Sequence, residues 1–173
     1  MRKTGLRLAL ILPALMAASP GRAAPQRAPD TPTPARVAAA IAADGPQRAL
    51  GRLADSDQFD TVTDGIAAAD PAWLALVPGM APGLDSDSGP AVAGALALAL
   101  PQNARLVLQV LDARYAALDP RHVCARPFMR DAVPDVAGYV RRTRAALRRM
   151  RDRSLRAVRD QCLAALGPAK GAP

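Results

Sequence analysis

Residues 90–100 read PAVAGALALAL, and the secondary structure of this stretch decides the fold class. Leu96, Leu98 and Leu100 alternate with alanines, which is the period of a β-strand. The alternating partners are apolar as well, so the stretch has no polar face, and Ala is depleted in strands and favoured in helices. We therefore predict a helix over these residues, ended by Pro101.

The composition of the whole chain favours the same class. The chain has 173 residues, of which 50% are hydrophobic and only 3% aromatic. Ala and Leu supply most of the apolar content, so the core must consist of small aliphatic side chains, which suits closely packed helices. We predict one compact all-α domain over residues 35–167, a bundle of about seven or eight short helices with one disulfide.

Caps and prolines divide the chain before this stretch. Thr33-Pro34 and Asp70-Pro71 each place a capping side chain ahead of a proline, a pair typical of helix starts. Ser56 or Asp57 can cap a further helix, and Asp85 or Ser86 the one over residues 90–100. The helices predicted on this side cover residues 35–43, 47–54, 58–69 and 72–80.

Apolar spacing predicts the helices that follow. Asn103 caps a helix whose apolar stripe runs to Leu118, and Asp119-Pro120 ends it. An irregular segment covers residues 123–133. Two more helices carry Val136, Val140, Thr143, Leu147 and Met150, and then Leu155, Val158, Cys162 and Leu166, the second capped by Asp152 or Ser154.

Residues 1–23 have the three parts of an export signal. Arg2, Lys3 and Arg7 precede an apolar run over residues 8–18, and small residues at 21 and 23 allow cleavage after Ala23. The run is shorter than the roughly 20 residues of a permanent membrane anchor, which is the alternative interpretation. We expect a periplasmic or secreted protein with a flexible Pro-rich lead over residues 24–34 and a disordered tail over residues 168–173.

The two cysteines predict a structural disulfide. In an exported protein with two cysteines, Cys124 and Cys162 are expected to pair. Their separation does not suit a redox-active pair, which usually has the spacing C-x-x-C. His122 lies near Cys124 in sequence, but we interpret it as a capping or solvent-facing residue. Asp85, Asp87 and Gly89 resemble the start of a calcium loop; Leu96 stands where a glutamate would be needed, so we predict a turn and a cap.

Charge is distributed unevenly along the chain. Cleavage after Ala23 lowers the formal net charge from +8 to +4; residues 24–120 then hold 11 Asp and 6 Arg, and residues 121–173 hold 12 Arg and Lys170 against 4 Asp. Arginines line one side of the apolar seam in the last two predicted helices. The main strip consists of Arg141, Arg144, Arg148 and Arg151; Arg142 and Arg149 widen it, and Arg153, Arg156 and Arg159 continue it.

The strip has two interpretations. It is a solvated face whose arginines partly pair with the Asp-rich first half, or it docks an anionic partner, either an acidic protein surface or lipid phosphate in the cell envelope. Nucleic acid is not expected as a partner, because of the predicted compartment and because no aromatic residues are interspersed among the arginines.

Five short motifs occur in an order that resembles a type of small exported bacterial protein. They are DPAWL (70–74), APGLD (81–85), ALPQNARLVL (99–108), VCARPF (123–128) and RDQCL (159–163), within a span of about residues 60–166. Because these motifs are caps, turns and the paired cysteines, the resemblance implies a helical exported domain and no particular chemistry.

The inventory of reactive side chains weighs against an enzyme. One His, two Cys and no Glu leave few general bases and metal ligands, so we expect no catalytic residues, metal or cofactor. The leading hypothesis is a non-catalytic periplasmic or secreted protein–protein interaction domain, such as an adaptor or an immunity-type inhibitor. Alternatives are a peripheral binder of anionic envelope lipid and an envelope hydrolase with an Asp pair as acid and base.

Overall fold

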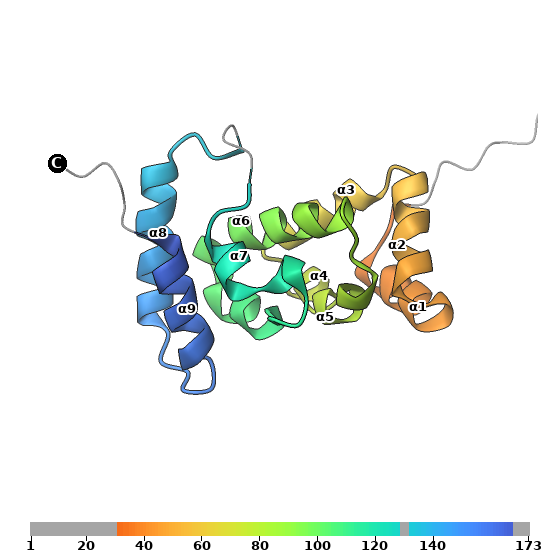
Figure 1. Ribbon diagram of the computed structural model, residues 1–173. Helices are drawn as coiled ribbons and strands as arrows, with labels where there is room; N and C mark the ends of the chain where they lie inside the picture. The colour runs from red at the N-terminus through yellow and green to blue at the C-terminus, as the bar shows by residue number, and fades with distance from the viewer. Residues whose placement is uncertain (1–30, 129–131, 168–173) are drawn as a thin grey trace, which may run out of the picture.

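A computed structural model describes residues 31–128 and 132–167 of the chain, and within these ranges it consists of helices and turns with no strand. The predicted all-α fold is confirmed. Helix α6, Ser88–Val110, contains the stretch 90–100 and runs through the middle of the molecule (Figure 1). The export signal, most of the Pro-rich lead and the tail lie outside the described residues.

Helices α1 (Pro34–Asp44) and α2 (Pro46–Asp55) lie together at one end of the molecule (Figure 1). The predicted cap is confirmed, because the side chain of Thr33 accepts a hydrogen bond from the backbone N–H of Arg36. Gly45 separates the two helices with φ 84°, a conformation open to glycine and rare for other residues.

Helix α3, Phe59–Ala67, agrees with its predicted range apart from its ends, but the predicted cap is wrong. Gln58 occupies the cap position and makes no side-chain bond to the helix. The hydroxyl of Ser56 instead donates 2.7 Å to the carbonyl oxygen of Arg52, at the end of α2. Val62 and Ile66 face the core, as their spacing predicted.

The single helix predicted over residues 72–80 is broken into two turns, α4 (Pro71–Leu74) and α5 (Val77–Met80), followed by the 3₁₀ turn η1 (Ala81–Gly83). The break has a local cause: Pro78 has no N–H to donate to the carbonyl of Leu74, and it lies in the first turn of α5, where no such donor is needed. The predicted cap is confirmed, since Asp70 accepts 2.7 Å from the N–H of Ala72.

The predicted break between two helices is confirmed to within two residues of Pro101, because α6 consists of two helical segments that meet at a kink. The backbone leaves helical geometry at Asn103 (φ −144°, ψ 68°), whose side chain accepts 3.2 Å from the N–H of Leu106, which is the predicted capping role. Pro101 leaves the carbonyl of Ala97 without its intrahelical donor, and the hydroxyl of Tyr139 donates to it instead at 2.7 Å.

The helix that was predicted to reach Leu118 ends at Val110. Asp112 turns the chain there: its carboxylate accepts 3.0 Å from the N–H of Arg114, and its own N–H donates 3.0 Å to the carbonyl of Leu118. A 3₁₀ turn, η2 (Ala116–Leu118), and the short helix α7 (Pro120–Cys124) follow. Asp119-Pro120 therefore begins a helix instead of ending one, and α7 runs into the segment predicted as irregular.

Helices α8 (Val136–Arg149) and α9 (Arg156–Leu166) stand side by side at the opposite end from α1 and α2 (Figure 1). Helix α8 packs on α6, and α9 packs on α7. The predicted seam residues Val140, Thr143 and Leu147 are buried. Asp152 binds the N–H and hydroxyl of Ser154 in the turn before α9, and the helix itself begins after Leu155 without a side-chain cap.

Helix α6 forms the centre of the core. Among the described residues it is the one helix long and apolar enough to cross a membrane by length and composition, but 61% of its most apolar window is buried inside the protein. It packs against α3, α4, α7 and α8. Fully buried side chains of α6 and of the elements around it include Val62, Ile66, Leu74, Val77, Leu96, Leu100, Leu108, Leu118 and Leu147.

Candidate functional site

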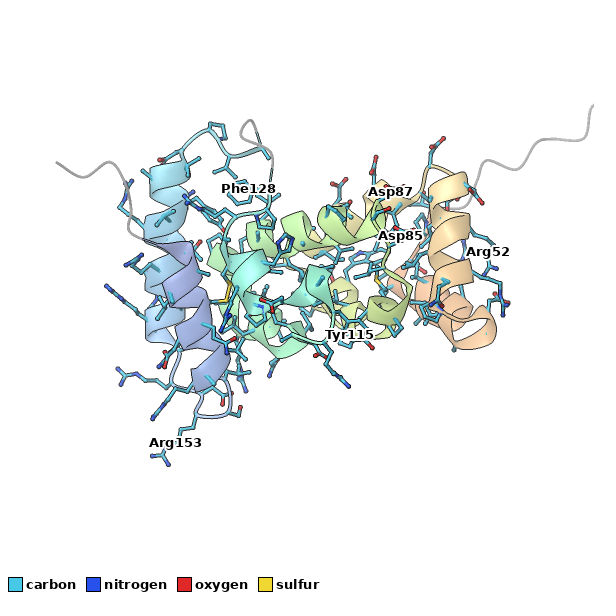
Figure 2. All side chains as sticks on the ribbon, viewed as in Figure 1. Arg52, Asp85, Asp87, Tyr115, Phe128 and Arg153 are labelled. Carbon is cyan, nitrogen blue, oxygen red and sulfur yellow. A yellow bond between two sulfur atoms is a disulfide. The ribbon has the colours of Figure 1, made fainter. Side chains whose placement is uncertain are left out.

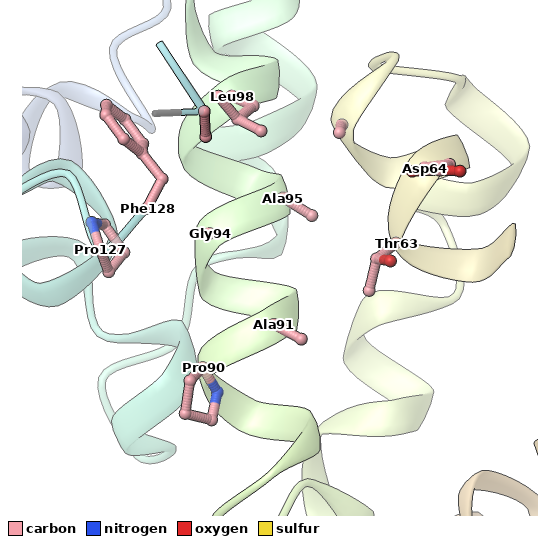
Figure 3. Close-up of a pocket in the computed structure, with 11 residues that line it drawn as sticks. Thr63, Asp64, Pro90, Ala91, Gly94, Ala95, Leu98, Pro127 and Phe128 are labelled. Carbon is pink, nitrogen blue, oxygen red and sulfur yellow. The ribbon is translucent and has the colours of Figure 1, made fainter. Parts of the chain in front are cut away.

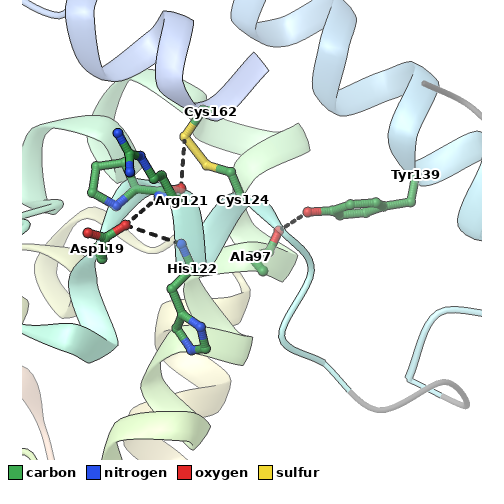
Figure 4. The surroundings of a disulfide bond; sticks show 8 residues. Ala97, Asp119, Arg121, His122, Cys124, Tyr139 and Cys162 are labelled. Carbon is green, nitrogen blue, oxygen red and sulfur yellow. Dashed lines mark hydrogen bonds between the residues drawn. A yellow bond between two sulfur atoms is a disulfide. The ribbon is translucent and has the colours of Figure 1, made fainter. Parts of the chain in front are cut away.

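Cys124 and Cys162 form a disulfide that ties the end of α7 to α9 (Figure 4). Their Cα atoms are 5.0 Å apart, and both residues are fully buried. The predicted pairing is confirmed. His122 is exposed, and its backbone N–H donates 3.3 Å to the Asp119 carboxylate that caps α7. With both sulfurs in the disulfide, Cys124 offers no thiolate to a neighbouring histidine.

The predicted arginine strip separates into two groups. Arg144 is half-buried and donates to the carbonyl oxygen of Gly167, which ends α9. Arg141 lies 4.0 Å from the carboxylate of Asp135, the residue that caps α8. Arg142 lies 3.8 Å from the same oxygen. These three guanidinium groups therefore contact parts of the helix pair itself, and only one of them, that of Arg144, is directed inward.

The second group consists of five arginines at the end of α8, in the turn between α8 and α9, and at the start of α9. Within the described residues these side chains are exposed and make no ion pair or hydrogen bond. Figure 2 shows Arg153 projecting at this extremity of the molecule. We call the group the basic tip; its members are Arg148, Arg149, Arg151, Arg153 and Arg156. The sequence indicated all five, but it did not separate them from Arg144, which has a partner.

The basic tip carries no long exposed apolar side chain. The apolar residues of its turn, Met150 and Leu155, are half-buried and pack against the core. Ala145 and Ala157 are the exposed apolar neighbours on the two helices. The surface therefore offers guanidinium groups and small side chains to a partner.

A hollow of about 540 Å³ lies toward the other end of the molecule, between α2, α3 and the segment leading into α6. Leu50, Phe59 and Leu84 provide its apolar part, and Asp60, Asp85 and Asp87 its carboxylates. We call it the acidic hollow. No local sequence pattern predicts it, because its walls come from segments far apart in the chain.

Asp85 has a structural role in the wall of the acidic hollow. Its carboxylate accepts 2.8 Å from the N–H of Ser88, 2.7 Å from the Ser88 hydroxyl and 3.0 Å from the N–H of Asp87. The hydrogen bond from the backbone of Ser88 is the main reason that the pKa of Asp85 is lowered. The predicted turn at this place is confirmed, and Asp85 remains charged at neutral pH.

A smaller hollow of about 240 Å³ lies between α3 and α6 (Figure 3). Its floor is formed by small residues of α6, including Ala91, Gly94 and Ala95, and Phe128 lies on the opposite side from Thr63. Pro127 and Ala132 complete its lining, and we assign it no ligand. Over residues 31–128 and 132–167, no three His, Cys or Asp side chains are grouped so that they could hold a metal ion.

No protein-family model matches the chain, and comparison with the curated proteins and with the solved structures finds no match.

Proposed function

We propose that this protein is a non-catalytic binding domain of the cell envelope that docks an acidic partner protein through the basic tip. The observation that carries the proposal is the contrast within one helix pair: Arg144 and Arg159 bond to backbone carbonyls of the fold, whereas the five arginines of the tip have no partner in the described residues. Adaptors and immunity-type inhibitors both belong to this class.

The chemistry of the tip suits carboxylates. A guanidinium group presents several donors in a plane and binds a carboxylate through two parallel hydrogen bonds. Unpaired arginines of one sign also attract an acidic surface from a distance and raise the rate of association. We expect binding that weakens as salt rises.

The tip is held in place before any partner arrives. Arg144 on α8 bonds to the end of α9, and Arg159 on α9 donates 3.2 Å to the carbonyl of Met150 at the end of α8. The disulfide fixes α9 to α7. The backbone of the tip therefore loses little conformational freedom on binding, which favours a partner of defined shape.

A protein partner suits the tip better than a lipid surface. Interfacial helices usually insert Trp, Phe or Leu side chains beside their basic residues. The exposed apolar neighbours at the tip are Ala145 and Ala157, which are too small to insert deeply. Binding to anionic vesicles is therefore the result that would support a lipid partner instead, and the experiment includes it.

The experiment compares two double variants that each lose two positive charges. The tip variant is Arg148→Gln with Arg153→Gln, and the control variant is Arg48→Gln with Arg121→Gln, two exposed arginines away from the tip. Mature protein is used to capture partners from an envelope extract. At low ionic strength we expect the tip variant to bind the captured protein at least about threefold more weakly, with a smaller difference at high salt.

Two results would contradict the proposal. Equal binding by the tip variant and the unmodified protein removes the tip from the function. Binding to vesicles of an anionic phospholipid, with no stoichiometric protein captured, would support the lipid alternative.

Export to the envelope is part of the same proposal and has its own test. It is supported by the charged, apolar and small-residue zones of residues 1–23 and by the disulfide, a bond favoured in oxidising compartments. The intact mass of protein recovered from the periplasm or medium should correspond to a chain beginning at Ala24. A retained Met1, in protein that resists a carbonate wash, would identify residues 1–23 as an anchor.

A further inference from the structure

The basic tip and the acidic hollow lie on opposite sides of the centre of one molecule: Arg153 projects at the α8–α9 end, and Asp85 and Asp87 lie toward α2 (Figure 2). Two such surfaces can meet only between molecules. We propose that the acidic hollow binds arginine side chains of the basic tip of a second copy, so that the mature protein associates head to tail. The inference rests on the proposed function, because it uses the same arginines as the docking element.

The acidic hollow has the chemistry that an arginine side chain requires. Phe59 is half-buried in it, and Asp60 follows directly on the same helix. A guanidinium group stacks on an aromatic face and pairs with carboxylates at its edge. Leu50 and Leu84 offer apolar surface to the methylene stem of the same side chain. A cluster of carboxylates alone would offer neither the aromatic face nor the apolar surface.

The walls of the acidic hollow are fixed by close packing. The amide of Gln47 donates 2.7 Å to the carbonyl of Pro82, which joins α2 to η1. Gly83 approaches the start of α2 so closely that a Cβ atom there would lie 2.6 Å from the carbonyl carbon of Pro46. The hollow therefore exists before a side chain enters it, and binding does not require it to form.

The shapes and positions of the two surfaces determine the type of assembly. The tip is a turn between two helices and projects outward, whereas the hollow is concave. A contact between two different surfaces is heterologous, so each added copy leaves one tip and one hollow unused. We expect a series of species that increases with concentration, and we expect charge screening to dissolve it.

The test is sedimentation of the mature protein at about 10 mM and about 1 M salt, where the Debye lengths are about 30 Å and about 3 Å. We expect a weight-average mass at least about twice that of one chain at low salt, and the mass of one chain at high salt. The tip variant, Arg148→Gln with Arg153→Gln, and a hollow variant, Asp60→Asn with Asp87→Asn, should each sediment as one chain under both conditions.

Mixing these two variants gives the decisive result. The tip variant keeps an intact hollow and the hollow variant keeps an intact tip, so an equimolar mixture should form a dimer at low salt that grows no further. A control variant, Asp55→Asn with Asp64→Asn, removes the same charge from exposed positions outside the hollow and should associate like the unmodified protein.

Three outcomes would overturn the inference: an unmodified protein that stays a single chain at low salt, a mixture that does not form dimers, or a control variant that loses association as fully as the hollow variant. The two proposals can fail separately. The hollow variant retains the tip, so it should still capture an acidic envelope protein. Capture without self-association refutes the head-to-tail contact alone, and self-association without capture refutes the proposed function alone.

Discussion

Tyr139 on α8 donates its hydroxyl hydrogen bond, 2.7 Å, to the carbonyl oxygen of Ala97 on α6 (Figure 4). That carbonyl would normally accept from the residue four positions later, which is Pro101 and has no N–H. A side chain of α8 thus donates to a carbonyl of α6 that Pro101 leaves without a backbone donor. It also fixes α8 against α6, because the tyrosine is buried between them.

Replacing Tyr139 by Phe should lower the free energy of unfolding by about 1–2 kcal/mol, since a buried carbonyl loses its donor while the ring remains. The matched control is Tyr115→Phe, a half-buried tyrosine that makes no hydroxyl hydrogen bond within the described residues. Urea unfolding of both variants gives the comparison. Equal effects would mean that the Tyr139 hydroxyl contributes nothing specific.

Burial also raises the pKa of Tyr139 from 10.0 to about 12. The folded protein therefore keeps a proton that the unfolded chain loses, and this contribution to stability is present below pH 10 and is lost as pH rises through the folded pKa. We expect stability to fall between these two pH values, by on the order of 2 kcal/mol. Tyr139→Phe should remove this fall and also the tyrosine absorbance step near pH 12.

Arg144 and Arg159 each donate to a carbonyl oxygen at the end of the other's helix, those of Gly167 and Met150. Arg144→Gln should therefore destabilise the protein by about 1–3 kcal/mol, because a charged donor to a half-buried carbonyl is lost. Arg148→Gln, on the exposed side of the same helix, should change stability by less than about 0.5 kcal/mol. Thermal unfolding of the two variants distinguishes these roles. If Arg144→Gln leaves the stability unchanged, Arg144 is a solvated arginine like those of the basic tip.

Much of this fold could be predicted from local signals. A capping side chain followed by proline marks the helix starts at Pro34, Pro71 and Pro120. At Asp119-Pro120 the apolar stripe of the preceding residues continues to Leu118, so apolar spacing alone places a helix end where a helix begins. Asp112 ends α6 through hydrogen bonds that hydrophobic spacing does not reveal.

The remaining features depend on partners that are distant in sequence. Tyr139 lies 42 residues from Ala97, and Arg144 lies 23 residues from Gly167. Local sequence signals predict the break in α6 near Pro101, but not the packing of α8 against it, which depends on the first contact, nor the division of the arginine strip, which depends on the second. The acidic hollow likewise requires the packing of η1 against α2, which only the tertiary structure supplies.

The disulfide should contribute most of its stability through the unfolded chain. Its cysteines are 38 residues apart, and closing a loop of this length stabilises by about 4 kcal/mol in the chain-entropy model. Replacing both Cys124 and Cys162 by Ala should lower stability by a few kcal/mol while circular dichroism still reports a helical protein. Thiol labelling of denatured, unreduced protein is the direct assay, and two free thiols in exported protein would contradict the bond.

Gly45 and Gly51 allow a paired test of backbone strain at the α1–α2 end. Gly45 has φ 84° and ψ 158°, and a Cβ atom there would meet no neighbour, so any cost of Gly45→Ala arises from the backbone conformation. We expect a loss of about 1–3 kcal/mol. Gly51 lies inside α2 with similar open space, and Gly51→Ala should stabilise by about 0.5–1 kcal/mol because alanine favours the helix. Urea unfolding of both variants should therefore give shifts of opposite sign; a shift of the same sign would show that residues 45 and 46 do not separate two helices in this way.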